Sequence, residues 1–130
     1  MKLRKETIEI IKKMDIELIY IFGSVITKTQ NENSDIDIAI LFKDGLSLDT
    51  SKSYFELYKA FSKEFIDKEI DIVYLNNASL TLKFDVITHG KIIYKDSEMY
   101  AYNYRENVIK EYIDFKPLLD YNEKQILKRI

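Results

Sequence analysis

The hydrophobic and polar positions of this chain follow two different spacings, one typical of helices and one typical of strands. Apolar residues recur at helical spacing over residues 3–14 and 48–65, while short apolar or alternating runs rich in β-forming residues occupy 17–22, 35–42, 69–75 and 91–94. The pattern predicts an α/β fold of the α+β kind, with a small mixed sheet of about four strands flanked by helices.

Further helices are expected between and after these strands. A short one follows Gly23 over residues 24–29, and another is capped by Asn77 or Ser79. Ser97 is expected to begin a long, tyrosine-rich C-terminal helix. Because proline lacks an N–H and clashes with the preceding turn, Pro117 is expected to interrupt this helix and leave a separate final one.

Composition narrows the class of protein. At 130 residues, the simplest organisation is one domain over 1–130. A net charge of −2 and a pI of about 5.5 argue against direct nucleic-acid binding. The chain has no cysteine, and no apolar run approaches the length of a membrane span. We therefore expect a cytoplasmic protein that does not associate with a membrane.

Two carboxylates open the predicted strand 35–42. Asp35 and Asp37 lie on one face of that strand, because successive strand residues point to opposite faces. Neighbouring carboxylates repel each other, and a divalent cation such as Mg²⁺ would remove the conflict. The alternative is that Asp35 caps the strand while Asp37 faces solvent.

A Gly-Ser turn precedes this acidic pair by ten residues. Gly23 lets the backbone approach a ligand closely, and Ser24 adds a hydroxyl at a predicted helix N-terminus, where free N–H groups bind phosphate. The alternative is a purely structural turn with Ser24 as the N-cap.

A third acidic residue stands in another predicted strand. Asp71 alternates with isoleucines as Asp35 and Asp37 do, and Glu69 is a weaker candidate at the strand edge. If the two strands are neighbours, three carboxylates converge. Such an arrangement suits two metals that flank a phosphoryl or nucleotidyl displacement.

The segment "GSVITKTQNENSDID", with Asp71 downstream, resembles the signature of the polymerase-β-type nucleotidyltransferase superfamily. The short chain resembles the minimal nucleotidyltransferase (MNT) antitoxins that are paired with HEPN toxins. The resemblance implies a nucleotidyltransferase-like fold, with two Mg²⁺ ions held by Asp35, Asp37 and Asp71. It also implies that Asp71 helps to deprotonate the acceptor, that Gly23 and Ser24 bind phosphates, and that AMP passes from ATP to a tyrosine of the HEPN ribonuclease.

The chain departs from this family in one place. Many relatives carry arginines and a glycine just after the Gly-Ser pair, where this sequence has Val25, Ile26, Thr27 and Lys28. We expect Lys28 to be either a substitute phosphate ligand or a solvent-exposed residue.

Two other features invite a functional interpretation. His89 is expected near a helix C-terminus, in a structural or capping role rather than a catalytic one. On one interpretation, Tyr102 and Tyr112 share a buried stripe with Met99 and Ile109. Because Tyr100, Tyr102 and Tyr104 cannot all face one side of a helix, some are expected to be exposed and to help dock the toxin.

Three other functions remain open at this stage. A metal-dependent glycosyltransferase would leave the Gly-Ser turn unexplained. A small-molecule nucleotidyltransferase would need further sequence to enclose its acceptor. An antitoxin that only occludes its partner is the main rival, and substitution of Asp35 and Asp37 separates it from a catalytic one.

Overall fold

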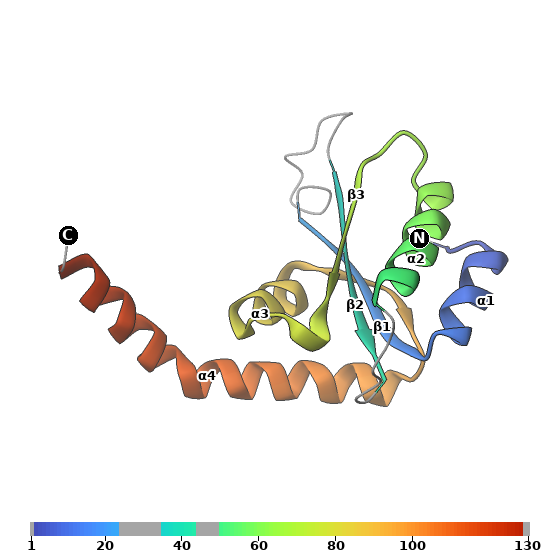
Figure 1. Cartoon of the computed structure of the whole chain (residues 1–130). Helices are drawn as coiled ribbons and strands as arrows, with labels where there is room; N and C mark the ends of the chain where they lie inside the picture. The colour runs from blue at the N-terminus through green and yellow to red at the C-terminus, as the bar shows by residue number, and fades with distance from the viewer. Residues whose placement is uncertain (1, 24–34, 44–49, 129–130) are drawn as a thin grey trace.

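The computed structural model of the chain describes residues 2–23, 35–43 and 50–128 (Figure 1). Along these residues the elements are α1 (Lys5–Lys13), β1 (Ile16–Phe22), β2 (Ile36–Phe42), α2 (Thr50–Glu64), β3 (Ile70–Tyr74), the 3-10 helix η1 (Leu75–Asn77), α3 (Leu80–His89), β4 (Lys91–Lys95) and α4 (Glu98–Lys128). The predicted α/β fold is confirmed. The short helix expected over residues 24–29 lies outside the described residues.

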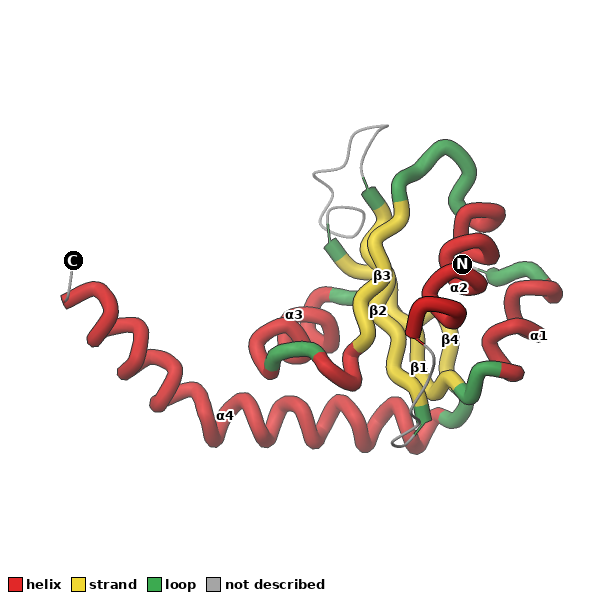
Figure 2. The backbone as a smooth tube through the Cα atoms, in the orientation of Figure 1, coloured by secondary structure: helices red, strands yellow, loops and turns green. Residues whose placement is uncertain are grey.

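The four strands form one mixed sheet in the order β3-β2-β1-β4 (Figure 2). β1 lies in the middle and pairs antiparallel with both β2 and β4, whereas β2 and β3 are parallel. Parallel strands need a crossover connection, and α2 provides it between β2 and β3.

Helices cover both faces of the sheet, because its strands alternate their apolar side chains between the two faces. On one face, Ile38 and Ile40 of β2 pack with Ile11 of α1 and Phe61 of α2. On the other face, residues that include Tyr20, Ala39, Val86 of α3, and Ala101 and Val108 of α4 form a second cluster. Figure 1 shows α1 and α2 on one side of the sheet and α3 on the other.

Two serines begin helices, as predicted. The Ser79 hydroxyl accepts a hydrogen bond from the Leu82 N–H at 3.2 Å, and the Ser97 hydroxyl accepts one from the Tyr100 N–H at 3.3 Å. None of the helices in the described part of the chain combines the length with the apolar run that crossing a membrane requires.

The predicted interruption at Pro117 is wrong. α4 runs as one helix from Glu98 to Lys128 with Pro117 inside it. A proline removes one backbone hydrogen bond and clashes with the preceding turn, and a helix can relieve that clash by bending instead of ending. In Figure 1, the C-terminal part of α4 turns away from the direction of its first part.

Candidate active site

The pairing of β2 with β3 brings two aspartates side by side. Asp37 and Asp71 are directly paired across the parallel strands, and Asp37 is also paired with Phe22 on β1. Asp37 alternates with Ile36 and Ile38, so its side chain lies on the face of the sheet that α3 and α4 cover. Asp71 lies on the same face for the same reason. The two acidic strands are therefore neighbours, which is the condition under which their carboxylates come together.

Asp35 stands just before β2, two residues from Asp37 and exposed to solvent. The strand pairing begins beside it, where the Ile36 N–H donates to the Glu69 carbonyl at 2.8 Å. Glu69 therefore contributes its backbone carbonyl to the pairing of β2 with β3. Its side chain is exposed at the strand edge.

Gly23 follows β1 directly and lies against Asp37. Its φ of +88° is in the left-handed region that favours glycine. A Cβ at this position would collide with Oδ2 of Asp37. The glycine of the Gly-Ser turn and the acidic pair therefore lie at the same end of the sheet. Ser24 and Lys28 lie outside the described residues.

The Asp37 carboxyl is electrostatically strained. Burial raises the pKa of Asp37 above its usual range, and the neighbouring carboxylates of Asp71 and Asp35 raise it further. The carboxylates of Asp71 and Asp35 therefore lie close enough to repel that of Asp37. A bound cation at this end of the sheet would offset that repulsion.

The donor set fits Mg²⁺ in its chemistry, because carboxylate oxygens are the hard ligands that this ion prefers. Among the described residues, no group of three or more His, Cys, Asp and Glu side chains is arranged to hold one metal ion by itself. Mg²⁺ commonly binds through one or two carboxylates and completes its shell with water and substrate phosphates. The paired Asp37 and Asp71 match that mode of binding.

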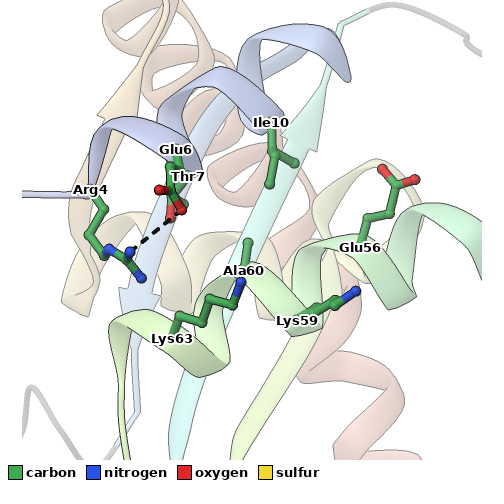
Figure 3. A pocket seen from close by; sticks show the side chains of 8 residues that line it. All are labelled: Arg4, Glu6, Thr7, Ile10, Glu56, Lys59, Ala60 and Lys63. Atoms are coloured by element: carbon green, nitrogen blue, oxygen red, sulfur yellow. Dashed lines mark hydrogen bonds and ion pairs between the residues drawn. The ribbon is translucent and has the colours of Figure 1, made fainter.

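Two cavities lie away from the acidic residues. One of about 290 Å³ opens between α1 and α2 (Figure 3) and is lined by Arg4, Thr7 and Lys59, among others. These helices cover the face opposite the one that carries Asp37. The other, of about 440 Å³, is lined in part by Tyr20 and Arg105.

Arg105 makes a contact between helices that the sequence pattern did not predict. Its Nη1 donates to the Ile87 carbonyl at 2.7 Å and so ties α4 to the last turn of α3. A cation near a helix C-terminus is favourable, and an acceptor carbonyl 18 residues away in the chain leaves no local pattern that would predict the contact.

The other predictions have mixed outcomes. His89 is the last residue of α3, at the helix C-terminus where it was expected, and its Nδ1 lies 3.0 Å from Oδ1 of Asp85. The predicted burial of Tyr102 and Met99 is wrong, because they are 64% and 72% exposed. Only the other two members of that stripe, Tyr112 and Ile109, are half-buried, since α4 turns the side that carries Ala101 and Val108 toward the sheet.

The mixed sheet, the parallel acidic pair and the glycine beside it define a nucleotidyltransferase fold. The chain belongs to the polymerase β nucleotidyltransferase family, which it matches over residues 5–99. The resemblance to the minimal nucleotidyltransferase antitoxins is likewise confirmed by the following relatives.

One relative is the protein adenylyltransferase MntA of Shewanella oneidensis, which is 38% identical over 89 residues. That alignment covers 66% of this chain and 61% of the relative, so the chain spans less than two thirds of that protein's length.

Two solved structures share the fold over most of the chain. The first, a toxin–antitoxin complex with AMP-PNP, matches with a TM-score of 0.74 and 27% identity over 96% of this chain and 99% of that one. The second holds a tri-AMPylated Shewanella oneidensis HEPN toxin in complex with an MNT antitoxin. It matches with a TM-score of 0.55 and 26% identity over 91% of this chain and 93% of that one.

Proposed function

We propose that this chain is an antitoxin that transfers AMP from ATP to a tyrosine of a partner HEPN toxin and thereby neutralises it. It acts in the cytoplasm as a single minimal nucleotidyltransferase domain over residues 1–130. The observation that carries the proposal is the in-register pair Asp37–Asp71, with Gly23 against Asp37.

The acidic residues and the Gly-Ser turn have separate roles in this proposal. Asp35, Asp37 and Asp71 hold two Mg²⁺ ions together with the nucleotide's phosphates. Gly23 and Ser24 bind those phosphates at the end of β1, where a glycine backbone allows a close approach. When bound, the two ions would neutralise charge on the transferring phosphoryl group and on the leaving pyrophosphate.

The reaction is an in-line displacement at the α-phosphorus of ATP. The phenol oxygen of the acceptor tyrosine forms a bond to that phosphorus, and the bond between it and the bridging oxygen of the pyrophosphate breaks. The phenol proton passes to the exposed Asp71 carboxylate, and pyrophosphate leaves. Asp71 serves as the base only when the acceptor oxygen lies within hydrogen-bonding reach.

Two of the matched structures support this proposal, one for the nucleotide and one for the acceptor. The AMP-PNP in one matched complex is an ATP analogue, which supports ATP as the nucleotide. The toxin in the other complex carries AMP groups, which supports a HEPN protein as the acceptor.

The test is the intact mass of a candidate HEPN partner toxin after incubation with the chain, ATP and Mg²⁺. We expect added AMP, with its loss in the variant Asp35→Ala/Asp37→Ala. The matched control is Glu6→Ala/Glu56→Ala, which removes the same charge from the opposite side of the sheet and should leave the transfer unchanged.

The rival is an antitoxin that works by occlusion. It predicts no added mass and equal inhibition of the toxin by the wild-type chain and the aspartate variant. That result would refute catalysis while leaving the partner correct.

A further inference from the structure

One side of α4 carries a continuous stripe of side chains in two rows. One row is Ala101, Val108, Phe115 and Asn122, and the other, four residues further along, is Arg105, Tyr112, Leu119 and Ile126. Residues separated by four or seven positions share one side of an α-helix, so the two rows form a single surface. We call it the α4 stripe.

The first half of the α4 stripe packs against the body of the protein, although Arg105 within it stays exposed. Ala101 and Val108 are buried in the cluster formed with α3 and the sheet. Arg105 donates to the C-terminal turn of α3, and the Tyr112 ring stacks on Phe84 with the ring centroids 3.8 Å apart.

No part of the chain that the structure describes covers the second half of the α4 stripe in this way. Phe115, Leu119 and Ile126 are 40–60% exposed, although they continue the spacing of the buried half. Figures 1 and 2 show this part of α4 extending beyond α3, with no described element beside it. A row of large apolar side chains at helical spacing on an extended helix is typical of a protein-docking surface.

The position of the stripe indicates what it binds. Its buried half packs in the same cluster as Ala39, the next residue on the Asp37 side of β2. A protein seated on the exposed half therefore lies on the side of the sheet toward which Asp37 and Asp71 point. In the matched complex with AMP-PNP, the alignment covers 96% of this chain, so that toxin-bound relative includes a counterpart of the second half of α4.

We propose that Phe115, Leu119 and Ile126 dock the protein substrate itself, through an apolar surface of the HEPN toxin. This inference rests on the proposed function for the identity of the partner. Docking through α4 would hold the toxin on the acidic side of the sheet and raise the local concentration of its tyrosine there.

The test compares Phe115→Ala/Leu119→Ala/Ile126→Ala with a control on the other sides of the same helix segment, Ile113→Ala/Tyr121→Ala/Leu127→Ala. The control residues are 59–64% exposed, so the control removes at least as much accessible apolar surface. Alanine preserves helix propensity in both variants. Toxin binding is measured by calorimetry without ATP, and AMP transfer by time courses of intact mass.

We expect the stripe variant to bind the toxin roughly tenfold or more weakly and to raise the KM for the toxin similarly, with kcat unchanged. The control should stay within about twofold of the wild type, because its side chains face away from the docked partner.

Equal toxin binding by the wild type and the stripe variant would overturn the docking surface while the proposed function stood. Equal weakening in the control would also overturn it. If the chain alone sediments as a dimer that only the stripe variant dissociates, and toxin binding is unaffected, the surface binds a second copy and the inference is wrong. If the wild type binds without transferring AMP and the stripe variant loses binding, the docking surface stands and the proposed activity fails.

Discussion

Gly23 and Asp37 are in such close contact that a methyl group on the glycine would clash with Oδ2 of the aspartate. The contact joins the end of β1 to the start of β2, which are paired through Phe22 and Asp37. It therefore couples the expected phosphate-binding turn to the carboxylate that the proposed chemistry needs.

We predict that Gly23→Ala destabilises the fold by about 1–3 kcal/mol, because it adds a clash to an unfavourable positive φ. It should also abolish AMP transfer. In a double-mutant cycle, Asp37→Ala should relieve about 0.5–1 kcal/mol of that cost, because it removes the carboxylate that the new methyl group meets. Chemical denaturation of the four proteins measures the coupling, and strict additivity would contradict the contact.

Replacement of Asp37 by asparagine should stabilise the protein while abolishing transfer. The pKa of Asp37 is raised in the folded state, so folding favours the protonated carboxyl. The free energy of unfolding therefore falls as the pH rises from the ordinary carboxyl pKa of the unfolded chain through the raised pKa of folded Asp37. Asp37→Asn removes that loss of stability. The variant should therefore be more stable than the wild type at about pH 7, and the difference in unfolding free energy should shrink toward about pH 4.

Urea denaturation with EDTA at both pH values measures this difference. Glu6→Gln, a remote exposed substitution, should show no comparable trend. A wild type that is more stable than Asp37→Asn at neutral pH, in the absence of metal, would contradict the mutual repulsion of the acidic residues.

Arg105→Met should cost about 1–2 kcal/mol of stability, because it leaves the Ile87 carbonyl without its donor and loosens α4 from α3. Thermal unfolding measures the loss. The control Lys110→Met, an exposed residue on the same helix, should change stability by less than about 0.5 kcal/mol. Equal effects of the two substitutions would show that the hydrogen bond contributes nothing.

Pro117→Ala should strengthen α4 by roughly 1–3 kcal/mol locally, because it restores a backbone donor and removes the ring clash. Slower amide exchange over residues 113–121 would show the gain, with Lys116→Ala as the control. The substitution also straightens the helix and redirects the second half of the α4 stripe. Toxin affinity should therefore fall even though the helix is more stable, and unchanged affinity would mean that the bend has no role in docking.

The sequence by itself determined the local features of this protein. The period-two alternation of "DIDIAILF" places Asp35 and Asp37 on one face of a strand before any tertiary contact is known. Hydroxyl caps at Ser79 and Ser97 and the turn at Gly23 act within a few residues, so their positions could be inferred from composition and spacing.

Only the tertiary structure decided which of these features meet. Asp71 lies beside Asp37 because β3 joins β2 in parallel, a pairing that depends on the crossover through α2. The burial of α4 could not be predicted either, since Met99 and Tyr102 carry large side chains that pack in cores as Val108 does, and only the position of the sheet selects which side is covered. The continuation of α4 through Pro117 could not be predicted for a related reason. The local sequence indicates only that a proline is unfavourable inside a helix. Whether the helix ends or bends there depends on the rest of the helix.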